Sequence, residues 1–241
     1  MRVPLKLRFY YLLSHFFQNK KTSKFSMDVP KNIREGEEFP IENLKTFLKE
    51  NDFETSNLIL KQFPSGYSNL TYFLNSSSKE FVLRRPPFGA KSLKGGHDML
   101  REYNVLKNLK SQFNKVPTVH LYCDDDNVIG APFYIMDRVE GYIIRPNLQE
   151  QDSPGEEIIR NVSDSLVSTL VELHNVDINE ANLNNLGNID GYVKRQVEGW
   201  IKRYNHSKTD IIANMDFVAK WLNDNQPLEV EGSIVHNDFK Y

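Results

Sequence analysis

The sequence lacks the features that would assign it to several common classes of protein. Its 241 residues contain one cysteine, Cys123, which excludes an internal disulfide and fits a reducing compartment. No apolar run approaches the ~20 residues that a transmembrane helix needs, so no transmembrane segment is predicted. The formal net charge of -2 gives no electrostatic reason to expect a nucleic-acid partner.

The short motifs of several enzyme classes are also missing. His15, His120 and His206 show no metal-ligand spacing, so a zinc site is not expected. There is no G-x-S-x-G, no Cys-His nucleophile pattern and no G-x-G-x-x-G phosphate loop. The sequence shows no internal repeat, and nothing in it predicts an oligomeric state.

The first 27 residues are basic and contain no acidic residue. Their cations surround the apolar patch 9–17 and are Arg2, Lys6, Arg8, Lys20, Lys21 and Lys24. Three interpretations remain open: a targeting or membrane-surface segment, upstream sequence before an internal start at Met27, and a disordered tail. The predicted location is therefore cytoplasmic or mitochondrial, and residues 1–37 are predicted to be a basic, flexible segment.

Periodicity then predicts a strand-rich part followed by a helical part. Apolar stripes predict helices over 40–51, 97–110, 156–173, 192–204 and 211–222. Short β-type runs predict strands over 58–63, 70–74, 81–84, 118–123 and 133–139, and composition predicts a turn at 124–127. We therefore expect an α+β fold, with residues 38–141 forming a five-stranded antiparallel sheet plus a helix, and residues 142–241 forming a partial helical lobe.

Glu102 lies within the apolar stripe of the predicted helix 97–110. A carboxylate in this position is costly unless it finds a cation, and Arg84 or Arg85 at the end of the preceding strand is the nearest candidate in sequence. Protein kinases pair a strand cation with a helix glutamate to hold nucleotide phosphates. A solvated glutamate at the edge of the stripe is the alternative.

Two further segments have both a functional and an ordinary interpretation. The turn 65–69, Ser-Gly-Tyr-Ser-Asn, could bring backbone close to a phosphate, or it could be a simple hairpin turn. The strand 133–136 ends at residues 137–141, where an adenine could meet backbone groups, or it could be only a core strand with an exit turn.

The last ten residues end in a His-x-Asp loop. Ile234 and Val235 form a short apolar run that predicts a buried strand leading to His236, Asn237 and Asp238. Kinase-type phosphotransferases place such an Asp beside the attacking hydroxyl.

These elements occur in kinase order, and the chain resembles the aminoglycoside phosphotransferase and choline kinase-like superfamily. More specifically, it looks like the kinase-like N-terminal part of acyl-CoA dehydrogenase family members ten and eleven. The resemblance covers residues 38–241 and is carried by segments 65–71, 81–87, 97–103, 134–141 and 235–240.

This resemblance implies a bilobal kinase-like fold and ATP-dependent phosphorylation of a small-molecule hydroxyl, with a hydroxyacyl compound as the preferred acceptor. It implies that Asp238 is the base and that His236 shares its catalytic loop. The nucleotide-binding residues that it implies are Gly66, Ser68, Asn69, Val82, Arg84, Glu102, Met136, Asp137 and Val139.

The family pattern places the magnesium ligands after residue 241, so the helical lobe is expected to be incomplete and no metal ligand is assigned within the chain. The chain alone is therefore expected to show little turnover even though the family uses ATP and Mg²⁺. The alternative function is a non-catalytic nucleotide-binding or interaction module.

Overall fold

The computed structural model describes residues 29–64, 69–77, 79–89, 97–141, 155–228 and 231–239. Its contacts divide the chain into two compact units, residues 1–183 together with 234–241, and residues 184–233. Within the described residues, the first unit holds all five strands and helices α1 to α4. The expected lobe boundary between residues 141 and 142 stays a prediction.

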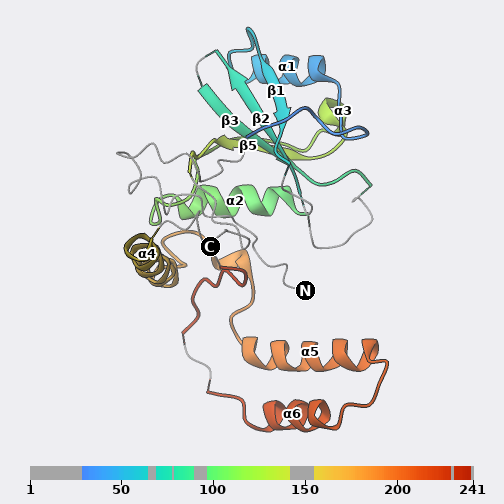
Figure 1. The fold of residues 1–241 in the computed structure, drawn as a ribbon, viewed down its shortest axis with the longest axis vertical. Helices are drawn as coiled ribbons and strands as arrows, with labels where there is room; N and C mark the ends of the chain where they lie inside the picture. The colour runs from blue at the N-terminus through green and yellow to red at the C-terminus, as the bar shows by residue number, and fades with distance from the viewer. Residues whose placement is uncertain are drawn as a thin grey trace. The chain divides into compact units, whose positions relative to one another are not determined.

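Five strands form one antiparallel sheet, as predicted (Figure 1). The strands are β1 (Ile59–Gln62), β2 (Leu70–Ser76), β3 (Lys79–Arg85), β4 (Val119–Cys123) and β5 (Phe133–Asp137). Their order across the sheet is β1-β2-β3-β5-β4. The central strand β3 is therefore paired on both sides, by β2 and by β5.

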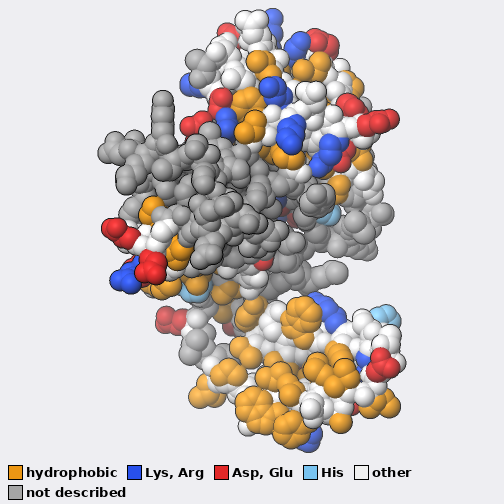
Figure 2. Space-filling view, viewed as in Figure 1, with side chains coloured by type: hydrophobic (Ala, Val, Ile, Leu, Met, Phe, Trp, Pro, Cys, Tyr) orange, Lys and Arg blue, Asp and Glu red, His pale blue; other side chains and the backbone are white. Residues whose placement is uncertain are grey.

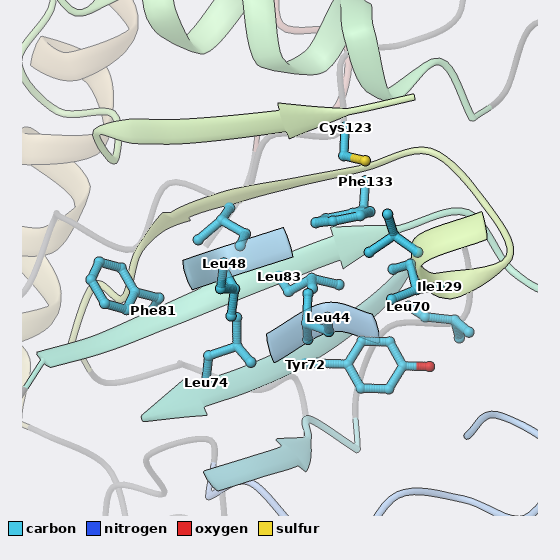
Figure 3. Packing of buried hydrophobic residues seen from close by; sticks show 12 residues of the cluster. Leu44, Leu48, Leu70, Tyr72, Leu74, Phe81, Leu83, Cys123, Ile129 and Phe133 are labelled. Atoms are coloured by element: carbon cyan, nitrogen blue, oxygen red, sulfur yellow. The ribbon is translucent and has the colours of Figure 1, made fainter. Parts of the chain in front are cut away.

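The main hydrophobic core lies on one face of this sheet, beneath helix α1 (Ile41–Glu50) (Figure 3). Leu44 and Leu48 of α1 are 0% and 1% exposed, and they pack with the inward side chains of β2, β3 and β5. The sheet residues in this core include Leu70, Tyr72, Leu74, Phe81, Leu83, Phe133 and Ile135. Their spacing of two along each strand is the reason why one face of the sheet is apolar.

Helix α2 (Met99–Leu109) lies on the opposite side of the sheet from α1 (Figure 1). The Asp98 side chain caps its N-terminus by accepting a hydrogen bond of 2.9 Å from the backbone N–H of Arg101. Met99, Leu106 and Leu109 are each at most 2% exposed. The apolar stripe of α2 is therefore buried, and it carries Glu102 into the structure with it.

The two consecutive arginines at the end of β3 point to opposite faces. Arg85 faces the core side and is 1% exposed. Its guanidinium donates to the carbonyls of Pro86 and Ile129, and it lies 3.9 Å from the centre of the Phe88 ring. Burial lowers the pKa of Arg85 from its ordinary value. Arg85 is therefore a structural side chain, which leaves Arg84 for the other face.

Three details of the sequence-based prediction are wrong. The segment predicted as a turn contains a one-turn helix, α3 (Asp126–Ile129), because Asp125 caps it and Gly130 ends it in the left-handed conformation. Strand β5 ends at Asp137 and not at residue 139. Ile234 and Val235 form no strand, because a two-residue apolar run needs a ladder partner, and none is assigned to it among the described residues.

Helix α4 (Glu156–His174) and the segment after it belong to the same unit as the sheet. The Lys115 ammonium contacts the Glu172 carboxylate at 2.7 Å and the Thr169 hydroxyl at 3.2 Å. The Gln112 side chain donates to the Glu180 carboxylate at 3.1 Å and accepts from the Asp177 backbone N–H at 3.0 Å. These bonds tie α4 and residues 177–180 to the loop that follows α2.

The second unit contains a short 3₁₀ helix (Asn184–Leu186) and helices α5 (Tyr192–Ser207) and α6 (Ala213–Asp224). Large apolar side chains are exposed on it, and Figure 2 shows them gathered on its surface. They include Trp200, Ile211, Phe217 and Trp221. None of the helices in the described part of the chain is long and apolar enough to cross a membrane.

We predict that Leu83→Ala destabilises the first unit by about 2–5 kcal/mol, because Leu83 is 0% exposed and truncation leaves a cavity in the core. The measurement is the urea midpoint followed by circular dichroism. Ile59→Ala on the edge strand β1 is the matched control. Because Ile59 is 49% exposed, this substitution should lower stability far less. Equal shifts of the midpoint in both variants would contradict the described core.

Candidate functional site

The predicted ion pair between Arg84 and Glu102 is present. The Nε atom of Arg84 donates to Oε2 of Glu102 at 2.9 Å, and each side chain is 17% exposed. Glu102 lies in the first turn of α2, where the partial positive charge of the helix N-terminus also favours a carboxylate. The pair links the central strand to the helix on the face opposite the main core.

Two neutral donors complete the coordination of the Glu102 carboxylate. The Tyr134 hydroxyl donates to Oε2 at 3.1 Å, and the Asn69 amide donates from Nδ2 to Oε1 at 2.9 Å. Tyr134 lies opposite Arg84 in the β3–β5 register, and Asn69 lies just before β2. We call these four residues, Arg84, Glu102, Asn69 and Tyr134, the Glu102 cluster.

Burial strengthens the hydrogen bonds and the ion pair of this cluster. Tyr134 is 1% exposed, and burial raises the pKa of its hydroxyl while the nearby Arg84 cation opposes the rise. Tyr134 therefore stays a neutral hydrogen-bond donor. A carboxylate that accepts from one charged and two neutral donors is well compensated, because the low local dielectric strengthens each bond. The result is that Arg84, whose side chain is 17% exposed, is held in place within the cluster.

Asn69 is the described end of the predicted phosphate loop, whereas Gly66 and Ser68 lie outside the described residues. Besides its bond to Glu102, its Oδ1 atom lies 2.6 Å from Nδ1 of His97. Both ends of the Asn69 amide are therefore engaged by side chains. The predicted role of Asn69 as a nucleotide-binding residue stays a prediction, but the residue has a structural task as well.

The residues predicted to face the adenine meet on the same face as Arg84. Val82 pairs with Met136 across β3 and β5. Val82, Phe63 and Phe73 form a small buried apolar cluster, and Met136 packs against it partly exposed. This second cluster is separate from the main core. Small-molecule sites are lined mostly by apolar and aromatic side chains of this kind.

The predicted hinge, residues 137–139, is fixed by bonds at its first two positions. The backbone N–H of Asp137 donates to the Thr118 carbonyl at 2.9 Å, and that of Arg138 donates to the Glu80 carbonyl at 3.2 Å. The Arg138 guanidinium forms an ion pair with Glu80. Neither of these backbone bonds uses the N–H of Val139.

The Asp137 and Arg138 side chains also connect the hinge to neighbouring residues. A carboxylate oxygen of Asp137 lies 2.6 Å from Nε2 of His120. The Arg138 guanidinium lies 5.1 Å from the centre of the Phe73 ring, within cation–π range. The hinge therefore connects directly to the small apolar cluster through Phe73.

The His-x-Asp loop has a defined local geometry. The backbone N–H of Asp238 donates to Nδ1 of His236 at 3.3 Å, so this ring nitrogen carries no proton. His236 is 4% exposed and packs edge-on against Phe239, at 5.5 Å between ring centres. Asn237 has φ 62°, a left-handed conformation that asparagine tolerates well. The loop thus buries His236 and leaves Asp238 partly exposed.

The structure therefore groups the predicted site residues into three sets. One is the Glu102 cluster, one is Val82 with Met136 beside the hinge, and one is His236 with Asp238. Sequence reasoning missed Tyr134 and His97 as members of the site. Tyr134 could have been found, because it alternates along β5 and lies opposite Arg84 in the pairing with β3. His97 was only the first residue of the predicted helix 97–110.

This arrangement defines a class of protein. An antiparallel sheet that holds a strand arginine against a helix glutamate, followed by helices and a His-x-Asp loop, is an α+β kinase-like phosphotransferase fold. Residues 59–240 match the family model of the phosphotransferase enzyme family, which includes the aminoglycoside phosphotransferases, and the chain belongs to this family.

Relatives and a solved structure agree with this assignment. The chain is 38% identical over 208 residues to acyl-CoA dehydrogenase family member 11 of Rattus norvegicus, covering 84% of this chain and 26% of that protein. It is 31% identical over 211 residues to family member 10 of Mus musculus, covering 86% of this chain and 19% of that protein. The chain thus spans about a quarter or less of the length of these relatives.

The structural match is to a crystal structure from Ralstonia eutropha with the provisional name aminoglycoside phosphotransferase. The TM-score is 0.67 and the identity is 30%, over 80% of this chain and 55% of that one. The expected kinase-like fold is therefore confirmed.

We predict that Glu102→Ala lowers the free energy of unfolding by on the order of 3 kcal/mol, because it leaves the buried donors of Arg84, Tyr134 and Asn69 without their acceptor. The control is Glu172→Ala, which breaks an ion pair with Lys115 at a carboxylate that is 52% exposed and should cost at most about 1 kcal/mol. Urea unfolding of both variants measures the difference. Equal losses would show that the cluster contributes no more than a surface pair.

We predict that stability falls above about pH 10, because burial raises the pKa of Tyr72 from 10.0 to about 12 and also raises that of Tyr134. Below pH 10 both states hold these protons, so the two tyrosines give no pH dependence there. Between about pH 10 and 12 only the unfolded state loses them, which favours unfolding.

The measurement is the urea midpoint at several pH values between 9 and 12, for the parent chain and for Tyr72→Phe. The variant should lose less stability per pH unit over this window. Identical slopes would contradict the burial of this hydroxyl.

Proposed function

We propose that the chain is the nucleotide-binding part of an ATP-dependent phosphotransferase that acts on a small-molecule hydroxyl. The observation that carries this proposal is the Arg84–Glu102 pair on the face of the sheet opposite the core. A fixed guanidinium suits bidentate contact with phosphate oxygens, and the family to which the chain belongs transfers phosphoryl groups.

In this proposal each set of site residues has one task. Arg84 contacts the α- and β-phosphates, and Glu102 holds it in place. Val82 and Met136 pack against the adenine, and backbone groups of the hinge, including the Val139 N–H, bind its edge. Gly66 and Ser68 of the turn, with Asn69 at its end, contribute to phosphate binding as the resemblance implies.

Asp238 acts on the acceptor. Its carboxylate orients the hydroxyl and accepts its proton as the phosphoryl group is transferred. The His236 ring supports this role by holding the backbone N–H of Asp238, which is a positioning task. The partial exposure of Asp238 is consistent with access by a substrate.

The residues that would hold ATP suit a nucleotide. On the sheet face that carries Arg84, a fixed cation lies on the same side as the apolar side chains of Val82 and Met136, which adjoin the hinge. For magnesium, which neutralises phosphate charge when bound, the described residues contain no group of three carboxylate, histidine or cysteine side chains that could hold a metal ion. No step of the proposal is therefore assigned to magnesium, and ligands after residue 241 stay a prediction.

We propose a hydroxyacyl compound as the acceptor. The support is the resemblance to the kinase-like part of two proteins whose names refer to acyl-CoA dehydrogenation. An amino sugar is the acceptor suggested by the name of the Ralstonia eutropha protein.

The first test is ATP binding, since low turnover by residues 1–241 alone stays a prediction. We expect Arg84→Gln to weaken ATP binding about tenfold or more, because a charge-assisted phosphate contact is lost; this corresponds to ~1.4 kcal/mol. Titration calorimetry with ATP measures the affinity. Arg160→Gln, an exposed arginine on α4, is the control and should bind as the parent does.

Absence of ATP binding by the parent chain would refute the proposal, and equal affinity in Arg84→Gln would refute the role of Arg84. Transfer is then tested with hydroxyacyl, choline and aminoglycoside acceptors. Any transfer should fall about 10²–10⁴-fold in Asp238→Asn, because the general base is lost. ATP binding with no transfer to any acceptor would favour the non-catalytic module.

A further inference from the structure

A chain of side-chain hydrogen bonds runs from His97 to Arg84. Nδ1 of His97 lies 2.6 Å from Oδ1 of Asn69, Nδ2 of Asn69 donates to Oε1 of Glu102 at 2.9 Å, and Oε2 of Glu102 accepts from Arg84 at 2.9 Å. Asn69 is 4% exposed, so the middle of this chain is shielded from water. The sequence singled out Arg84, Glu102 and Asn69, but not His97 at the end of the chain.

The direction of each bond follows from the chemistry of the groups. An ionised carboxylate only accepts, so the amide of Asn69 must present its NH₂ group to Glu102 and its oxygen to His97. The Asn69 oxygen can only accept as well. Nδ1 of His97 must therefore carry a proton, whatever the state of Nε2.

The two oxygens of Glu102 are held from different elements. Asn69, which lies just before β2, holds Oε1, whereas Arg84 of β3 and Tyr134 of β5 hold Oε2. Without the Asn69 bond, the carboxylate could rotate about its terminal torsion, which has a broad energy profile. His97 is directly before Asp98, the cap of α2, so the bond from His97 to Asn69 also joins the start of β2 to the start of α2.

We propose that His97 and Asn69 are positioning residues for Arg84. They lock the Glu102 carboxylate in the orientation that presents Arg84 to the phosphates of the nucleotide. The nucleotide part of this proposal rests on the proposed function, whereas the hydrogen-bonded chain itself can be tested without any nucleotide. Asn69 then acts through Glu102, in addition to or in place of the direct contact that the sequence suggested.

The nucleotide-free test is the tautomer of His97. Long-range ¹H–¹⁵N correlation spectra of the 241-residue chain, assigned with His97→Gln, should show a proton on Nδ1 of His97. Asn69→Leu should remove this preference and should broaden or shift the Arg84 Nε–H signal, although it touches neither atom of that bond. A His97 ring protonated only at Nε2, or an Arg84 signal unchanged in Asn69→Leu, would overturn the proposal.

The functional test is ATP affinity by calorimetry in three variants. His97→Phe removes the donor and should weaken ATP binding about three- to tenfold. His97→Gln keeps a donor and should restore affinity to within about twofold of the parent. His206→Phe changes an exposed histidine of α5 and should have no effect.

Asn69→Asp is the matched variant for the bond between Asn69 and Glu102. It keeps the oxygen that faces His97 but places a carboxylate against Glu102, so its affinity should fall as much as in His97→Phe or more. The losses of ATP affinity measured in the single variants His97→Phe and Asn69→Leu should not add in the double variant, because both substitutions break the same chain of hydrogen bonds. Fully additive losses would mean that Asn69 acts independently of His97, and they would overturn the shared positioning role.

Thermal midpoints within a few degrees of the parent show that each variant is folded. If the parent does not bind ATP but the His97 tautomer is as expected, the proposed function fails and the hydrogen-bonded chain stands. If the parent binds ATP but His97→Phe binds equally well, the proposed function stands and the positioning role fails.

Discussion

The structure around the site depends on one constraint, which is that the Glu102 carboxylate is largely buried and must be compensated. Burying a carboxylate is costly, and its acceptor capacity has to be filled by donors. Those donors come from the start of β2, from β3 and from β5, so the demand of one side chain fixes three strands against α2. Arg84 is held as a consequence of this compensation, because its Nε atom is one of the donors that the carboxylate needs.

Most of the sheet could be predicted from the sequence because its signal is local. The alternation of apolar and polar residues in β2, β3 and β5 indicates both the strands and the face that each side chain occupies. The pairing of Glu102 with an arginine was also predictable, since a charged residue within an apolar stripe needs a partner. The apolar stripe alone left the choice between Arg84 and Arg85 open, because it depends on which face of β3 is covered by α1, whereas the family resemblance pointed to Arg84.

Two of the remaining errors, at His97 and at Ile234, have a common physical cause, which is that they involve partners far away in the sequence. His97 joins the site through a bond that spans 28 residues, and no local pattern predicts such a contact. Strand alternation could place Tyr134 on the Arg84 face, but not its bond to Glu102, which spans 32 residues. The strand expected at Ile234 failed for the same reason, since a strand is defined by the segment that pairs with it. The small helix after Asp125 was missed because aspartates favour both turns and helix caps.

The consecutive arginines at the end of β3 have a further consequence for tolerance to changes of chain length. Because side chains alternate between faces, removing one residue from the first half of β3 would move Arg85 into the position of Arg84 and carry Arg84 into that of Leu83. Glu102 would still meet a guanidinium, so the charge pairing would survive the deletion. The core under α1 would instead receive an arginine where it now holds a leucine. The apolar face of the sheet therefore limits changes in the length of β3. Because two arginines are consecutive, the ion pair on the other face would tolerate the same deletion.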